Sequence, residues 1–186
     1  NELKVIFDKM DIDVWDVVNA AATKPLGFMP FYPGPGLGGH CIPIDPFYLS
    51  WKARQHGIET RFIGLAGEIN THMPHYVVER MAEALALKTG KKMSEAHILM
   101  IGMAYKKNID DMRESPALVL TELIEEAGAT CVYHDPYVAE IPMTREHASL
   151  AGRTSVALSQ AEISQADCVV IVTDHDNVDY AQLGAQ

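Results

Sequence analysis

Apolar residues recur at helical spacing through the first half of the chain. In DIDVWDVVNAAATK they gather on one side of a helix, with Asp11 or Asp13 near its start. A helix is also predicted around PFYLSWKARQHG, and a long one from about Phe62 to Leu87, in which Pro74 permits a kink. The chain opens in helical register at NELKVIFDKM, without a capping residue ahead of that helix.

The pattern changes in the second half, where apolar runs alternate with amphipathic segments. HILMIGMAY, His97 to Tyr105, is an unbroken apolar run of the kind found in buried parallel strands. SPALVLTELIEEAG predicts a helix capped by Ser115, while ATCVYHDP and ADCVVIVTDH predict two further strands. This alternation indicates a doubly wound α/β domain. We therefore expect a helical region over residues 1–92 and a Rossmann-like α/β domain over residues 93–186.

Composition and charge narrow the classes of protein. The chain has 186 residues, of which 48% are hydrophobic and 22% charged, as in ordinary globular proteins. A net charge of -10 argues against unspecific binding to nucleic acid or to anionic lipid. No apolar run approaches the roughly 18 residues of a membrane span, and no signal-peptide pattern is present, so a cytoplasmic location is expected. Three cysteines without CxxC spacing suggest neither a disulfide framework nor a zinc ribbon.

The glycine-rich stretch GPGLGG, Gly34 to Gly39, matches the dinucleotide fingerprint GxGxxG. That fingerprint requires a buried strand before the first glycine and a helix opening at the second. Here the flanks are GFMPFYP and HCIPIDP, whose prolines oppose both elements. We therefore expect this glycine turn to expose the cysteine that follows it rather than to hold a pyrophosphate.

Cys41 is the candidate nucleophile, although a free cysteine is more often a small buried residue. Asp45 lies four residues further on, about one helical turn if the chain is helical there, and could orient a group or act as a base for water. A dyad of Cys41 with His40 and a metal site built from all three side chains are the alternatives. The metal site is disfavoured, because no second cluster of ligands accompanies it, and no metal is expected.

The loop AYKKNIDDMRESP follows the first predicted strand, at the sheet edge where ligands of doubly wound domains bind. Lys106 supplies a cation, and Arg113 can contact a phosphate or carboxylate with two N–H groups. The alternative is a solvated loop in which Arg113 pairs with Asp110 or Asp111. Position alone does not separate these two interpretations.

Together, GPGLGGHCIPIDPFYL, IGMAYKKNIDDMRESPA and VYHDP resemble the UDP-glucose and GDP-mannose dehydrogenase family. PFYPGPGLGGHCIPIDP is most similar to the UDP-N-acetylglucosamine 6-dehydrogenase branch. The resemblance implies a central helical region that forms a homodimer and a C-terminal α/β domain that binds a UDP-sugar. It also implies that the NAD domain and the family's catalytic lysine and asparagine precede Asn1, and that a last substrate-binding arginine lies beyond Gln186. The fragment alone is then expected to be inactive.

The resemblance also assigns roles to single residues. Cys41 matches the family's nucleophile, Asp45 the carboxylate that positions the hydrolytic water, and Arg113 an arginine that reaches NAD. Substrate contacts are implied at Tyr32, Leu37, Gly38, Tyr105 and Lys106.

The implied reaction oxidises the C6 alcohol of a UDP-(N-acetyl)hexosamine to the uronate through a thiohemiacetal and a thioester on Cys41, with NAD as the oxidant. Two other classes stay open. One is a UDP-sugar-binding module without catalysis, and the other is a hydrolase or acyltransferase that uses Cys41 with His40. The apolar residues of the long helix predict a homodimer through the helical half.

Overall fold

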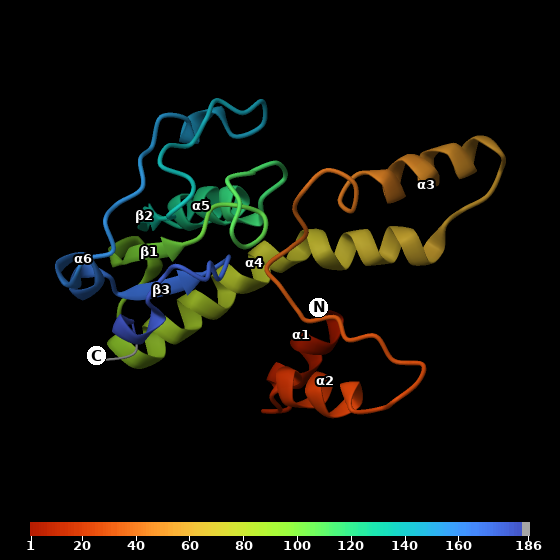
Figure 1. Ribbon diagram of the computed structural model, residues 1–186, viewed down its shortest axis with the longest axis horizontal. Helices are drawn as coiled ribbons and strands as arrows, with labels where there is room; N and C mark the ends of the chain where they lie inside the picture. Colours follow the sequence, from red (N-terminus) through yellow and green to blue (C-terminus); the bar gives the residue numbers. More distant parts are fainter. Residues whose placement is uncertain (184–186) are drawn as a thin grey trace.

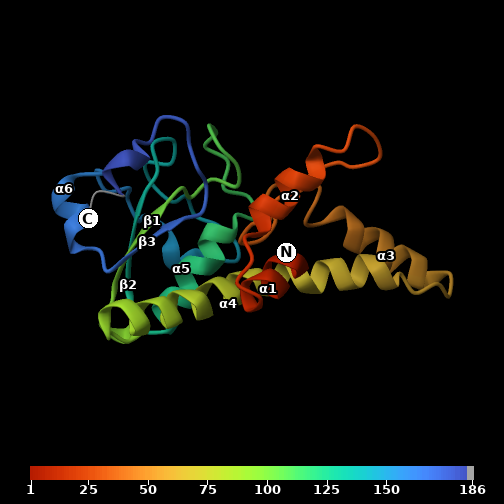
Figure 2. The same cartoon turned by 90° about the horizontal axis from the view of Figure 1, so that it is seen from below.

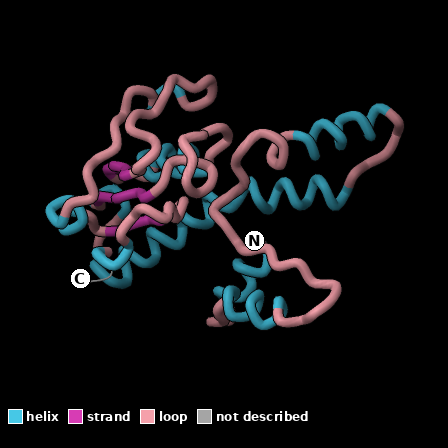
Figure 3. Tube along the Cα trace, viewed as in Figure 1, coloured by secondary structure: helices cyan, strands magenta, loops and turns pink. Residues whose placement is uncertain are grey.

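In residues 1–183, which the computed structural model describes, four α-helices precede the first strand (Figure 1). They are α1 (Glu2–Lys9), α2 (Val14–Ala22), α3 (Asp45–Gln55) and α4 (Arg61–Thr89). A long irregular segment joins α2 to α3, and it carries the glycine turn, residues 34–39 (Figure 3). The sequence thus predicted these helices, with Asp13 rather than Asp11 as the cap of α2, because its side chain accepts a hydrogen bond from the Trp15 N–H.

Asn1 occupies the N-cap of α1, where no capping residue was expected. Its side chain, however, makes no capping hydrogen bond. Instead, Asn1 Nδ2 donates to Asn70 Oδ1 at 2.5 Å, and Asn1 Oδ1 accepts from the Gly34 N–H at 3.0 Å. Beside it, Asp8 accepts from the hydroxyl of Tyr76. These contacts fix α1 and the start of the glycine turn to the side of α4.

Helix α4 runs through both parts of the molecule (Figures 1 and 2). It continues through Pro74 as one helix and ends at Gly90, whose φ of 72° is left-handed. Met81 and Leu85 are only 6% and 2% exposed, because they pack into the core of the α/β domain. The α/β domain therefore covers part of the apolar face from which a homodimer was predicted. Large apolar side chains stay exposed at the start of α4, with Phe62 at 90% and Leu65 at 51%.

The strands form a parallel sheet of order β2–β1–β3. Its members are β1 (His97–Ile101), β2 (Thr130–His134) and β3 (Cys168–Ile171), with α5 (Pro116–Glu126) and α6 (Gln160–Gln165) between them and short 3₁₀ turns at Met93–Glu95, Ala148–Leu150 and Tyr180–Gln182. Ser115 caps α5 as predicted, through a hydrogen bond to the Ala117 N–H. Ile98 of β1 lies opposite Cys131 of β2 and Cys168 of β3.

Both faces of β1 are covered, which makes the domain doubly wound as predicted. Ile98 and Met100 pack into a cluster with residues of α4 and α5, while Leu99 and Ile101 pack with Ile163 of α6 and with Val178. The carboxyl ends of the strands point toward the middle of the molecule, where the glycine turn passes (Figure 1). This is the sheet edge at which ligands of such domains bind.

Candidate functional site

The glycine turn packs against the loop after β1, residues 102–114, here named the β1 loop. The Gly39 N–H donates to the Arg113 carbonyl at 2.8 Å, although the two residues are far apart in sequence. A methyl group on Gly38 would lie 2.5 Å from Tyr105 Cβ and 3.0 Å from the Glu114 carbonyl oxygen. Gly39 is buried with a φ of +91°, a conformation that favours glycine. The two sequence motifs therefore form one site.

The same contacts explain the match to a dinucleotide fingerprint. In the described chain no strand precedes Gly34, and protein side chains lie directly against three glycines of the turn. Tyr105 lies against Gly38 and Gly39, and Pro116 lies against Gly36. The glycines thus permit close packing of two loops and do not form a phosphate cradle.

Cys41 follows the turn with an exposed side chain. Its carbonyl accepts a hydrogen bond from the Asp45 N–H at 2.8 Å, so the chain between them forms the one helical turn that the spacing predicted. Asp45 is the first residue of α3, where a carboxylate is favoured by the helix dipole. The Cys41 Sγ lies 4.0 Å from His40 Nδ1, at the long end of a sulfur hydrogen bond.

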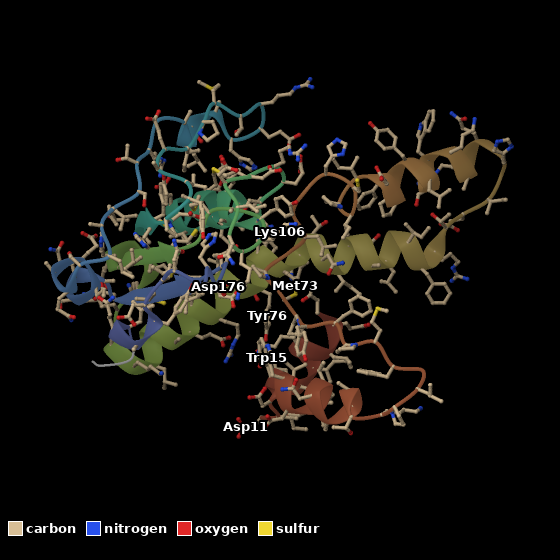
Figure 4. All side chains as sticks on the ribbon, viewed as in Figure 1. Asp11, Trp15, Met73, Tyr76, Lys106 and Asp176 are labelled. Carbon is tan, nitrogen blue, oxygen red and sulfur yellow. The ribbon has the colours of Figure 1, made fainter. Side chains whose placement is uncertain are left out.

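The β1 loop carries the predicted cations. The Lys106 side chain is exposed, with its Nζ 5.8 Å from the centroid of the Tyr105 ring. Figure 4 shows Lys106 at the side of the α/β domain that faces the middle of the molecule. The Tyr105 N–H donates to the Asp111 carbonyl at 3.0 Å, which closes the loop.

Arg113 forms the internal pair that was the alternative to ligand binding. Its Nε and Nη2 donate to the Asp111 carboxylate at 3.0 and 2.6 Å. This hydrogen bonding raises the pKa of Arg113. The guanidinium is 64% exposed, so a charged group of a ligand can still reach it. Arg113 is therefore positioned by Asp111, on the loop whose backbone binds Gly39, two residues before Cys41.

Two cavities open on either side of the glycine turn. The first has a volume of about 570 Å³ and is mostly apolar; Leu37, Phe47, Asn70 and Pro74 are among its lining residues. Pro74 has no N–H, so it cannot donate the usual helical hydrogen bond to the Asn70 carbonyl. That carbonyl oxygen lies near Gly36. The second, of about 640 Å³, is more polar and is lined by groups that include His40, Asp111, Arg113 and Arg145.

The predicted residues are thus brought together with one exception. Leu37, Gly38, Cys41 and Asp45 lie on the turn and the start of α3, and the β1 loop holds Tyr105, Lys106 and Arg113. Tyr32 is the exception: it is 52% exposed, and its hydroxyl donates to Asn19 of α2 at 2.9 Å.

The sequence analysis missed two buried polar residues at the ends of β2 and β3. Asp135 and His175 are 3% and 0% exposed, and His175 Nε2 lies 3.1 Å from Asp135 Oδ2. Asp135, in VYHDP, directly follows β2, and His175, in ADCVVIVTDH, lies four residues after the end of β3. Reading all three strand ends by the rule that was applied to the first would have found them. Within residues 1–183, no group of three or more side chains suited to metal binding occurs.

Comparison with known proteins identifies a family whose two domains match the two parts of this chain. Residues 1–72 match the central domain of the UDP-glucose/GDP-mannose dehydrogenase family, and residues 99–185 match its UDP binding domain. The chain belongs to this family. Its members are oxidoreductases that act on nucleotide sugars, and the helical region followed by a Rossmann-like domain is their arrangement.

Individual relatives of the family carry several sugar names. UDP-N-acetyl-D-mannosamine dehydrogenase of Salmonella typhi is 36% identical over 95% of this chain and 41% of its own length. NDP-N-acetyl-D-galactosaminuronic acid dehydrogenase of Ralstonia nicotianae is 32% identical over 94% of this chain and 38% of its own length. The structure of the UDP-D-ManNAc dehydrogenase of Pyrococcus horikoshii superposes with a TM-score of 0.80 at 30% identity, over 98% of this chain and 40% of that one.

The chain therefore spans about 40% of the length of these relatives. The names of these relatives are those of N-acetyl-D-mannosamine and N-acetyl-D-galactosaminuronic acid dehydrogenases. Over the described residues, no helix combines the length and the apolar character that a membrane span requires.

Proposed function

We propose that the complete protein is an NAD-dependent dehydrogenase that oxidises the C6 alcohol of a UDP-N-acetylhexosamine to the carboxylate. The packing of the glycine turn on the β1 loop supports this proposal best, because the exposed Cys41 follows that turn two residues after Gly39, which is hydrogen-bonded to the loop that carries Lys106 and Arg113. In the proposal, this chain supplies the covalent nucleophile and the nucleotide-binding domain.

Cys41 provides the covalent step. Its thiolate adds to the C6 aldehyde carbon and forms the C–S bond of a thiohemiacetal. Once that carbon is oxidised, Cys41 carries a thioester. Asp45, one helical turn away, takes a proton from the water that attacks the acyl carbon, after which the C–S bond breaks and the carboxylate leaves.

The described residues fit one contact to the cofactor rather than a complete cofactor site. Arg113, whose side chain is exposed on the β1 loop, would bind an acceptor group of NAD, whereas the glycine turn, packed against Tyr105 and Pro116, offers no pyrophosphate cradle. When bound, NAD supplies the hydride acceptor. Lys106, exposed on the β1 loop, would contact the substrate through charge-assisted hydrogen bonds.

The contact between His40 and Cys41 favours a second candidate, a thiol-dependent hydrolase. Such an enzyme would need no NAD. A UDP-sugar-binding module, the third class, would bind the nucleotide sugar without producing NADH. The measurement of NADH production therefore distinguishes both classes from the dehydrogenase.

The test compares Cys41→Ser and Asp45→Asn in the complete protein. Serine is close in size but far less nucleophilic, so Cys41→Ser should lower steady-state NADH production by about a thousandfold or more while UDP binding persists. Asp45→Asn should instead accumulate the thioester, which intact-protein mass spectrometry detects as an adduct of the nucleotide sugar.

Cys131→Ser is the matched control. Burial raises the pKa of the Cys131 thiol to about 12, so this cysteine is not ionised at neutral pH and its replacement should leave turnover near normal. Near-normal NADH production by Cys41→Ser would overturn the covalent mechanism. Turnover of substrate without any NAD would favour the hydrolase.

A further inference from the structure

His175 lies fully buried in the segment after β3, between the ends of the other two strands. Its Nδ1 lies 2.9 Å from the backbone nitrogen of Asn108, and its Nε2 lies 3.1 Å from Asp135 Oδ2. A backbone N–H can only donate, so Nδ1 must be the acceptor of that hydrogen bond. The imidazole proton then resides on Nε2 and is donated to the carboxylate, which fixes the tautomer of the neutral ring.

Asp135 makes this arrangement rigid. Its Oδ2 also accepts from the N–H groups of Met103 and Ala104, at 2.6 and 3.2 Å. Its Oδ1 accepts from the N–H groups of Tyr137 and Val138, at 2.7 and 3.0 Å. The carboxylate thereby joins the chain after β1 to the chain after β2. His175 extends this buried network to the segment after β3.

The residue that His175 holds belongs to the β1 loop. The backbone of Asn108 has a φ of +64°, a left-handed conformation that asparagine adopts more readily than most residues other than glycine. Its side chain also binds Asp176, and Lys107 pairs with the same carboxylate at 2.9 Å. These outer contacts are exposed, and exposed ion pairs contribute little to conformational stability. The hydrogen bond from the Asn108 N–H to the buried His175 is itself partly buried, so it is the stronger restraint on the loop.

Figure 4 shows Asp176 and Lys106 on the same side of the domain, which agrees with the contact between the two segments. Lys106 is two residues from Asn108, so the backbone of Asn108 sets the place from which the Lys106 side chain extends. A cationic side chain contributes to ligand binding only when it is held where the ligand's charge will lie.

We propose that His175 is a positioning residue for the nucleotide-sugar site, which it serves by holding the Asn108 N–H and thereby the β1 loop. This inference rests on the proposed function, because it takes the β1 loop to be the part that meets the nucleotide. His175 touches no ligand itself; it acts through Asn108 and Lys106.

Two substitutions separate the two hydrogen bonds of the imidazole. In His175→Asn, the amide oxygen can replace Nδ1 as the acceptor for Asn108, but the bond to Asp135 is lost. In His175→Gln, the longer amide can replace Nε2 as the donor to Asp135, but the acceptor for Asn108 is lost. Gln also fills the buried space better, so it should be at least as stable as Asn.

Calorimetry with UDP, which the candidate substrates share, measures the effect in the complete protein. We expect His175→Gln to bind UDP about tenfold more weakly than the wild type, the scale of one buried hydrogen bond, and His175→Asn to bind within about twofold of it. Lys106→Ala gives the loss of UDP affinity caused by removing the lysine that is proposed to contact the substrate. The order of thermal stability should be the opposite of the order of UDP affinity, with His175→Gln no less stable than His175→Asn. If His175 had a merely structural role, the less stable variant would also bind UDP more weakly.

Equal UDP affinity of the two His175 variants would overturn the inference while leaving the proposed function intact. No UDP binding by the wild type would overturn the proposed function, and the inference with it. A measurement on the unmodified protein covers the case in which neither variant folds. The ¹⁵N spectrum of the imidazole should show a protonated Nε2 and an unprotonated Nδ1 that is coupled to the Asn108 amide; a protonated Nδ1 would contradict the inference.

Discussion

Gly38 has space for a hydrogen atom but not for a methyl group. An alanine Cβ there would lie 2.5 Å from Tyr105 Cβ, and neither the tyrosine Cβ nor the nearby Glu114 carbonyl can move away as a flexible side-chain end could. The glycine turn would have to lift from the β1 loop. Gly34, in the same turn, has only an ordinary contact at 3.8 Å from the Gly36 carbonyl oxygen.

We therefore expect Gly38→Ala to lower the free energy of unfolding by about 2 kcal/mol, the scale of an overpacked contact. Gly34→Ala is the control, and should change that free energy by about 0.5 kcal/mol or less. Urea unfolding at neutral pH measures both, provided that the slope with denaturant is unchanged. Equal stability of the two variants would contradict this prediction, because the turn would then move away from the β1 loop without lowering the free energy of unfolding.

At the scale of the elements, Asp135 joins the ends of β1 and β2. Burial alone raises the pKa of its carboxyl, but the hydrogen bonds from four backbone N–H groups together hold the pKa below the ordinary value of 3.8. A carboxyl whose pKa is lower in the folded chain stabilises the fold above the unfolded pKa. That contribution is lost as the pH falls through the folded pKa.

Stability should accordingly decline between about pH 5 and pH 2, and part of this decline belongs to Asp135. Asp135→Asn leaves buried N–H groups without their charged acceptor, so we expect a loss of about 3 kcal/mol at pH 7 and a weaker dependence on acid. Asp179→Asn is the matched control, since Asp179 is exposed and its side chain accepts from the Ala181 N–H. Urea unfolding at several pH values would contradict this if both variants kept the wild-type acid profile.

The sequence predicted the elements well, because each is specified by local patterns. Apolar runs identified the strands, and Ser115 and Gly128 marked the ends of α5. It could not predict that the C-terminal half of α4 completes the core of the following domain, since an amphipathic helix does not say what covers its apolar face.

Contacts between distant segments were likewise out of reach. Spacing predicted the turn from Cys41 to Asp45 and a charged loop after β1. The packing of Gly38 on Tyr105 and the bond from Asn108 to His175 join residues far apart in the chain, so no local pattern encodes them. Sequence alone also left the state of Arg113 open, because its pairing with Asp111 depends on the loop conformation.

For the molecule as a whole, the outward helices leave a broad apolar surface. Helix α3 and the start of α4 expose large side chains, including Tyr48, Trp51, Phe62 and Leu65. Exposed apolar surface of this extent marks an interaction site in soluble proteins. The opposite half of α4 differs, because its apolar face is already buried by the α/β domain. The surface available to a partner is therefore narrower than the sequence pattern suggested, and it lies on the helical half.

We accordingly expect the complete protein to form a homodimer through α3 and the N-terminal half of α4. Phe62→Glu, which places a charge on that surface, should weaken the dimer by about tenfold or more, because an unpaired charge is costly to bury. Leu87→Glu is the control at the other end of the same helix, where Leu87 is 86% exposed and lies beyond the half of α4 assigned to the partner. It should leave the dimer unchanged. Analytical ultracentrifugation at micromolar concentration would contradict the prediction if the wild type were monomeric, or if the two glutamate variants dissociated equally.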